Sequence, residues 1–147
     1  KYKNIRSDGG ATSDLTKEFG DVDFPVFRLS EMYLIYAEAV LRGGTGGDLA
    51  TALNHINKIR TRAGATNFIA ADLTLQNMLN ERGRELYWEG HRRTDLIRYG
   101  LLTTGTYLWP WKGGVSSGTA VDTKYNIFPV PAVNRTANPN LTQNDGY

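Results

Sequence analysis

Two stretches with a helical period lie close together in this chain, separated only by a short glycine-rich link. In each stretch apolar side chains recur every three or four residues, which predicts one buried face per helix. The stripe of the helix predicted over residues 29–42 comprises Leu29, Met32, Tyr33, Tyr36, Ala37, Val40 and Leu41. The stripe of the helix predicted over residues 49–63 comprises Leu49, Ala52, Leu53, Ile56 and Ile59. Together they predict an αα-hairpin similar to one tetratricopeptide-type repeat, in which small Ala37 and Ala52 permit close approach.

Residues with capping preferences stand at the ends of both helices. Ser30 is a candidate cap for the first helix, and Asp48 is a good N-cap for the second. Gly64 follows basic residues and is a plausible C′ position. The link, residues 43–47, is glycine-rich but lacks the Gly-Lys-Ser/Thr ending of a phosphate-binding loop and follows no strand. We therefore interpret it as a flexible connection between helices.

Two further helices are predicted before the helical pattern ends. The first covers residues 75–88, with Thr74 or Asp72 as its cap, and contains Gly83, which costs roughly 1 kcal/mol relative to alanine. The second covers about residues 92–99 and ends at Gly100. From residue 101 the sequence predicts an irregular region, extended over the proline-containing residues 125–131 and ending in an ordered strap. The predicted fold is mostly α, with two helix hairpins across which the C-terminal region wraps.

The composition limits the classes of protein to consider. The chain has 147 residues, enough for one domain, and its net charge of +2 argues against a nucleic-acid binder. It contains no cysteine, which excludes disulfides and thiolate catalysis, and no apolar run long enough to span a membrane. Because Lys1 is not a natural start, we expect a trimmed protein or a piece of a longer one. Residues 1–23 are predicted to be a loop or linker from upstream structure, and residues 24–147 a domain.

Five arginines and four acidic residues lie between residues 81 and 98. Because arginine holds carboxylates in fixed geometry, this nearly neutral set predicts structural ion pairs between helices. The predicted members are Glu81, Arg82, Arg84, Glu85, Glu89, Arg92 and Asp95. The alternative is a carbohydrate-active enzyme that uses Glu81 or Glu85. It requires an exposed pair of acids about 5–10 Å apart across a cleft.

His91 and Asp95 are four residues apart and could orient one another in a catalytic or metal site. No nucleophile accompanies them, however, and His55 is the only other histidine. We therefore predict no catalytic residue, no metal and no cofactor. A helix-capping or buried, hydrogen-bonded role is expected for His91.

Three aromatic residues on a turn-rich segment are the candidates for ligand contact: Tyr107, Trp109 and Trp111. Flat rings stack on the apolar face of a sugar, and aromatic residues on loops belong to the core less often than those on a helix stripe. The alternative is that the two tryptophans close the end of the helical layer.

Several segments, in this order, resemble the C-terminal part of the SusD/RagB family. They are residues 28–39, 56–64, the acidic and basic helix at 81–96, the Trp-x-Trp-Lys-Gly-Gly turn at 109–114, the Phe-Pro-Val-Pro strand at 128–131 and the closing Gln-Asn-x-Gly-Tyr at 143–147. The resemblance covers roughly residues 24–147. Two positions depart from it: Asp145 stands where the family usually has proline, and Gly83 where arginine is common.

The resemblance implies a function that composition alone does not. Members of this family are lipid-anchored nutrient-binding proteins, mostly α-helical and several hundred residues long. They capture glycans, or in some cases peptides, and cover a SusC-like TonB-dependent transporter. The resemblance thus implies a non-catalytic protein at the extracellular face of the cell outer membrane. It also implies an oligosaccharide ligand and an N-terminal lipid anchor that is absent from this chain.

The runner-up is a tetratricopeptide-like adaptor that binds a peptide or protein segment. Exposed Trp109 and Trp111 on a shared platform would favour sugar, whereas buried tryptophans and an open groove lined by the first helix would favour peptide.

Overall fold

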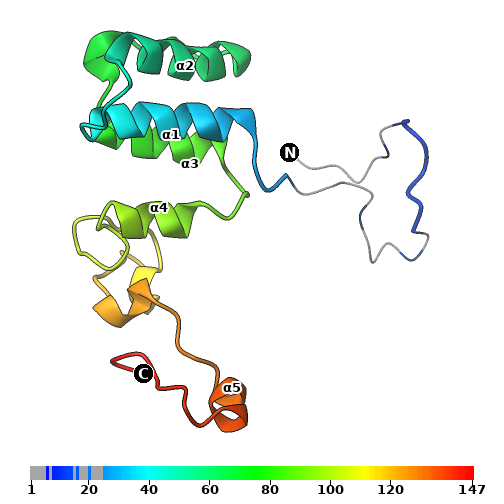
Figure 1. The fold of residues 1–147 in the computed structure, drawn as a ribbon, viewed down its shortest axis with the longest axis vertical. Helices are drawn as coiled ribbons and strands as arrows, with labels where there is room; N and C mark the ends of the chain where they lie inside the picture. Colours follow the sequence, from blue (N-terminus) through cyan, green and yellow to red (C-terminus); the bar gives the residue numbers. More distant parts are fainter. Residues whose placement is uncertain (1–5, 7, 15, 17–19, 21–24) are drawn as a thin grey trace. The chain divides into compact units, whose positions relative to one another are not determined.

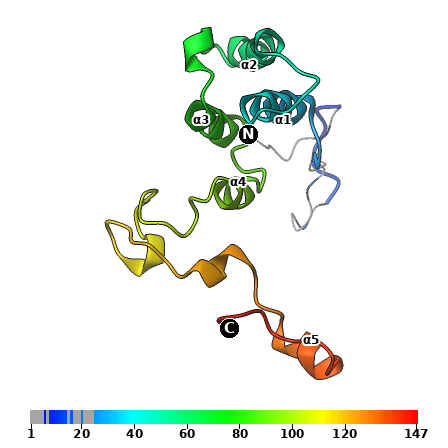
Figure 2. The same ribbon diagram turned by 60° about the vertical axis from the view of Figure 1, so that its left-hand side comes forward.

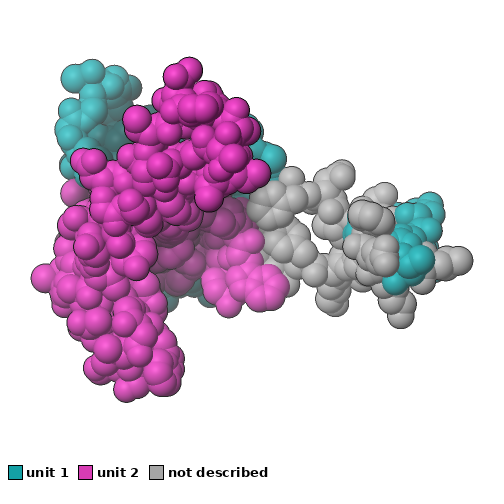
Figure 3. Space-filling model, turned by 90° about the horizontal axis from the view of Figure 1, so that it is seen from below, with its two compact units in different colours: residues 1–70 teal, residues 71–147 magenta. Residues whose placement is uncertain are grey.

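The computed structural model describes residues 6, 8–14, 16, 20 and 25–147. Within these residues every regular element is a helix and there is no strand, which confirms the mostly α prediction. The chain divides into two compact units, residues 1–70 and 71–147, coloured teal and magenta in Figure 3. Much of the predicted linker, residues 1–23, lies outside the described residues, so that the boundary at residue 24 stays a prediction. None of the helices in the described part has both the length and the hydrophobicity of a membrane span.

The first unit contains the predicted helix hairpin. Helices α1 (Leu29–Leu41) and α2 (Leu49–Arg62) pack side by side (Figures 1 and 2). Ala37 and Ala52 are both fully buried, as expected of small residues at a close helix contact. Leu29 and Met32, predicted on the buried face of α1, are instead 64% and 42% exposed. Because apolar side chains occur nearly all round α1, its sequence period does not show which face packs.

Side-chain capping differs between the two helices. Asp48 is the N-cap residue of α2, and its two carboxylate oxygens accept from the backbone N–H and the hydroxyl of Thr51, each at 2.8 Å. These hydrogen bonds, the backbone one first, hold the pKa of the Asp48 carboxyl below its usual range. For α1 the N-cap residue is Arg28, without a side-chain cap, and Ser30, the predicted cap, lies in the first turn. Gly64 has a φ of +69°, as predicted for a C′ residue.

The link between α1 and α2 is held by specific contacts, which the prediction of a flexible connection did not anticipate. Gly44 donates its N–H to the carbonyl of Ala39 at 2.8 Å, and the N–H of Asp48 reaches the Tyr36 hydroxyl at 3.1 Å. A Cβ at Gly47 would lie 2.7 Å from the Val40 side chain, so a larger residue would push the link away from α1.

The second unit begins with helices α3 (Leu75–Glu85) and α4 (Arg92–Arg98), preceded at the boundary by the 3-10 helix η1 (Ala70–Asp72). Thr74 caps α3 by accepting from the N–H of Asn77 at 3.1 Å. The buried apolar residues of this unit are Leu73, Met78, Leu79, Leu86 and Leu96. Helix α3 ends at Glu85, three residues before the predicted end.

Helical turns recur beyond residue 101, contrary to the prediction. They are η2 (Lys112–Gly114), η3 (Thr123–Asn126) and α5 (Ala132–Ala137). The predicted extended segment therefore begins only at Ile127, and no strand forms at residues 128–131. Helix α5 starts directly after Pro131, whose fixed φ of −57° suits the start of a helix.

The C-terminal tail folds back on the segment between η3 and α5. The side chain of Gln143 accepts from the N–H of Val130 at 2.8 Å and donates to its carbonyl at 3.1 Å, so that an amide replaces a neighbouring strand. Asn144 donates to the carbonyl of Phe128 at 2.7 Å, and the Tyr147 hydroxyl to that of Ile127 at 2.9 Å. The tail is thus the ordered strap that was predicted, and it pairs with the segment between η3 and α5.

Candidate functional site

A tight turn brings the ends of α3 and α4 together. The turn runs from Leu86 to Gly90, with a backbone hydrogen bond of 3.0 Å from the N–H of Glu89 to the carbonyl of Leu86. Trp88 lies within it at a φ of +67°, a left-handed conformation that is rare for a bulky residue. The turn follows directly after the end of α3 at Glu85 and leads into α4, which contacts α3.

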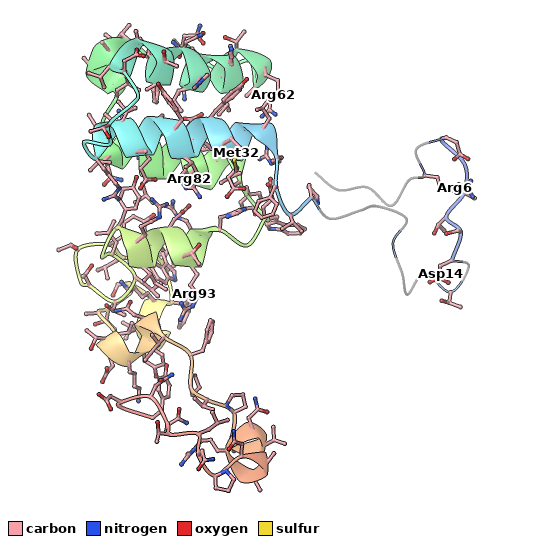
Figure 4. The ribbon with its side chains drawn as sticks, in the orientation of Figure 1. Arg6, Asp14, Met32, Arg62, Arg82 and Arg93 are labelled. Carbon is pink, nitrogen blue, oxygen red and sulfur yellow. The ribbon has the colours of Figure 1, made fainter. Side chains whose placement is uncertain are left out.

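A buried ion pair joins the two helices. Arg82 on α3 donates from Nε to Asp95 Oδ1 on α4 at 2.8 Å, and the two side chains are only 5% and 2% exposed. Arg98 donates to the same oxygen at 2.6 Å from the surface. Figure 4 shows Arg82 directed from α3 towards α4. Ion pairs were predicted for Arg82 and Asp95, but their mutual pairing across the turn could not be read from the sequence.

The acids of α3 do not form a catalytic pair across a cleft. Glu81 is 5% exposed, and its carboxylate accepts from Arg84 Nη2 at 2.5 Å. Glu89 is buried and Glu85 half-buried. Within the described residues no three His, Cys, Asp or Glu side chains gather closely enough to hold a metal ion. His91 is the N-cap residue of α4 but makes no side-chain cap.

Arg92 differs from its prediction, because it has no carboxylate partner in the described part of the chain. It donates to the carbonyl of Leu79 at 2.7 Å and to the hydroxyl of Tyr107. Its approach to α3 depends on Gly83, where an added Cβ would lie 2.9 Å from Arg92 Nη1. The glycine that was expected only to weaken α3 therefore makes room for the guanidinium that connects α3 to Tyr107.

A buried lysine organises the loop that carries the predicted ligand contacts. Lys112 is 2% exposed, and its ammonium donates to the carbonyls of Thr104 and Tyr107 at 2.5 and 2.7 Å. The same ammonium lies 4.8 Å from the ring centroid of Trp109. It therefore fixes the loop backbone and covers one face of the Trp109 ring.

Trp109 borders two neighbouring cavities. The first, of about 420 Å³, is lined by Arg92, Arg93, Leu96, Leu102, Tyr107 and Trp109. The second is about 480 Å³ and includes the aromatic residues Trp109, Tyr125, Phe128 and Tyr147. Both are mainly apolar, with a few fixed cationic groups at their edges, which is the usual character of a small-ligand site. We call them together the Trp109 cleft.

The three predicted contact residues fall into two groups. Tyr107 and Trp109 lie together, with ring centroids 6.3 Å apart and an interplanar angle of 60°, and Trp109 is 37% exposed. Trp111 is 69% exposed, has a φ of +69° and lines neither part of the cleft. The two tryptophans are thus accessible, but they do not share one platform.

The family model of the SusD family matches residues 2–147. The chain belongs to the SusD family. It is 46% identical over its whole length to the starch-binding protein SusD of Bacteroides thetaiotaomicron, and 33% identical over 126 residues to the SusD-like protein P25 of Formosa agariphila. It covers 25% and 23% of these two proteins, so it spans about a quarter of the length of the curated relatives it matches.

Solved structures agree with this SusD-family assignment. The surface glycan-binding protein A of Bacteroides thetaiotaomicron superposes with a TM-score of 0.69 at 30% identity, over 86% of this chain and 25% of that one. A SusD superfamily protein of Parabacteroides distasonis gives 0.63 at 26% identity, over 87% of this chain and 28% of that one. The mostly helical fold and the resemblance seen in the sequence are both confirmed.

Several residues of the candidate site were not predicted from the sequence. Arg93 donates to the carbonyl of Tyr125, and its guanidinium lies 4.1 Å from the ring centroid of Phe128. Figure 4 shows Arg93 on the side of α4 that faces the C-terminal segment. Phe128 and Tyr147 belong to segments noted only as motifs. The available signal was the presence of two motifs that contain aromatic residues, at residues 128–131 and 143–147, close enough together for the tail to fold back on the first.

Proposed function

We propose that this chain forms the C-terminal part of a glycan-binding protein that captures oligosaccharides at the extracellular face of the outer membrane. The capture is non-covalent: sugar rings stack on Trp109, and hydroxyls bond to polar groups around the cleft. The bound glycan is then delivered to a SusC-like TonB-dependent transporter. The names of two related proteins, a starch-binding protein and a surface glycan-binding protein, support glycan as the ligand class.

The observation that carries this proposal is the position of Trp109. It is accessible, held by Lys112 and Tyr107, and borders two apolar cavities, as a pre-organised stacking residue requires. The adaptor alternative called for buried tryptophans, and neither Trp109 nor Trp111 is buried. The enzyme alternative lacks its exposed acid pair, since Glu81 is buried against Arg84.

The test is calorimetric titration of the intact protein with malto-oligosaccharides and a panel of neutral plant and host glycans. Loss of one aromatic stacking contact of about 0.5–1.5 kcal/mol weakens binding roughly twofold to twelvefold. We expect this loss for Trp109→Ala but not for Trp111→Ala, the matched control. Equal affinities in both variants would remove Trp109 from the site.

A further inference from the structure

A third cavity, of about 630 Å³, lies at the turn between α3 and α4 and contains an excess of positive charge. We call it the arginine cavity. Its charged lining consists of Arg82, Arg84, Arg92 and Arg93 against a single carboxylate, Asp95, with His91 beside them. Such a concentration of guanidinium groups in a concave surface attracts anions.

Two of the four guanidinium groups are not neutralised. Arg82 is paired with Asp95, and Arg84 with Glu81. In contrast, Arg92 and Arg93 donate only to neutral oxygen atoms, and neither has a carboxylate partner within the described residues. Their hydrogen bonds hold them in place while leaving their charge uncompensated. A guanidinium group that is held in place can donate two parallel N–H bonds to a pair of anionic oxygens, such as those of a carboxylate or a sulfate group.

A buried donor of the same cavity also lacks an acceptor. Arg82 is only 4% exposed, yet its Nη1 has no hydrogen-bond partner in the part of the chain that is described, and neither has Oδ2 of its partner Asp95. Buried polar groups are almost always paired with protein or with an ordered molecule. A water that accepts from Arg82 Nη1 and donates to Asp95 Oδ2 would satisfy both atoms, and its second hydrogen would be available to an anion in the cavity.

An aromatic pair stands at the edge of the cavity. Tyr87 and Trp88 both line it, are 63% and 74% exposed, and stack with centroids 6.0 Å apart at an angle of 29°. Trp88 is presented by a left-handed backbone, a conformation that glycine would adopt more readily. Two adjacent exposed rings beside fixed cations form a surface for a ring-shaped, anionic ligand.

We propose that the arginine cavity is a subsite for an acidic sugar residue, one that bears a carboxylate or a sulfate group. Its anionic group contacts Arg92 and Arg93, and its ring lies against Trp88. The same two arginines border the Trp109 cleft, so one oligosaccharide can reach from Trp88 to Trp109 across them. The inference rests on the proposed function for its ligand class, and specifies that the glycan is acidic at this end.

The experiment titrates the intact protein with three pairs of probes that differ in charge. They are a galacturonic-acid oligosaccharide and its neutral methyl ester, a sulfated galactose oligosaccharide and its unsulfated form, and a polyglutamate peptide beside polyglutamine. We expect at least one acidic saccharide to bind tenfold or more tightly than its neutral form, with an affinity that falls as salt is raised. The acidic saccharide that the protein prefers shows whether the subsite takes a carboxylate or a sulfate group.

Two variants locate the preference in the cavity. Arg93→Gln should lower the ratio of acidic to neutral affinity about threefold, because Arg92 still contacts the anionic group. Trp88→Gly removes the ring at a position where glycine fits the backbone, and should weaken the acidic saccharide about tenfold. Trp111→Gly is its matched control, because Trp111 is also exposed, also left-handed and outside the cavity.

The outcomes separate this inference from the proposed function. No preference for either acidic saccharide, an unchanged preference in Arg93→Gln, or tighter binding of polyglutamate than of any saccharide would overturn the acidic subsite. The effect of Trp109→Ala on neutral glycans tests the proposed function alone, so either idea can fail while the other stands.

Discussion

Breaking the Arg82–Asp95 pair should cost far more stability than breaking any surface ion pair of this chain. Asp95→Asn keeps the shape of the side chain but removes its charge, which leaves the Arg82 guanidinium, 4% exposed, without a counter-ion. Removing one partner of a buried pair typically costs 3–5 kcal/mol. We expect about 3 kcal/mol, at the low end, because Arg82 Nη1 is unpaired already.

Replacing the other partner, Arg82, should lower the free energy of unfolding by less than replacing Asp95, for a reason that the structure shows. In Arg82→Met the Asp95 carboxylate keeps the 2.6 Å contact from Arg98, so we expect a loss of about 2 kcal/mol. Arg98→Met removes a side chain that is 42% exposed and should cost less than about 1 kcal/mol. This variant is the control for non-specific effects of replacing an arginine.

The decisive measurement is a double-mutant cycle by urea unfolding of the intact protein, followed by circular dichroism. If the two side chains stabilise one another, the double variant Arg82→Met with Asp95→Asn should lose about 3 kcal/mol of unfolding free energy. The losses of the two single variants add up to about 5 kcal/mol. The coupling is then about 2 kcal/mol. Single costs that add within about 0.5 kcal/mol would refute the view that this pair holds α3 against α4.

Three further substitutions test contacts elsewhere. Gly83→Ala should not stabilise the wild-type protein, because its Cβ displaces the Arg92 guanidinium, but should stabilise an Arg92→Ala variant by about 1 kcal/mol in thermal unfolding. Lys112→Met leaves two carbonyls without their donor and should cost about 2–4 kcal/mol by urea unfolding, with a red shift of tryptophan fluorescence. Hydrogen bonds from Thr51 lower the pKa of the Asp48 carboxyl in the folded state. The stabilising effect of the ionised Asp48 cap is therefore complete above about pH 3.8 and is lost as pH falls through the folded-state pKa. The stability advantage of wild type over Asp48→Asn, measured by urea unfolding from pH 7 to pH 2.5, should therefore shrink only at the acidic end.

The helices were predictable because their determinants are local. The apolar period, the Asp48 and Thr74 caps and the glycine at residue 64 act within a few residues of one another. The end of α3 was mispredicted because Leu86 continues the apolar pattern, while a tertiary contact between α3 and α4 turns the chain at that point. Helix α5 has only six residues, too few to give a clear period.

The site was less predictable, because composition does not determine pairing. The tail is held by side-chain amides that bond to backbone groups 13 and 16 residues away, and such contacts have no period in the sequence. The residue types of the charged cluster were identified, but not which arginine faces which acid. The aromatic candidates were found from residue type, whereas the separation of Trp111 from the cleft depends on the path of one loop.

Local pairing explains how a nearly neutral segment can form a cavity with a net positive charge. Five arginines and four acids between residues 81 and 98 suggest that the charges cancel. In the structure, however, Glu81, Glu85 and Glu89 lie outside the arginine cavity, and its one acid, Asp95, is shared by Arg82 and Arg98. Helix α4, only seven residues long, depends on such tertiary contacts for its stability. The buried pair thus holds the helix that presents Arg92 and Arg93, so loss of Asp95 should weaken binding of acidic ligands indirectly even though its removal makes the cavity more positive.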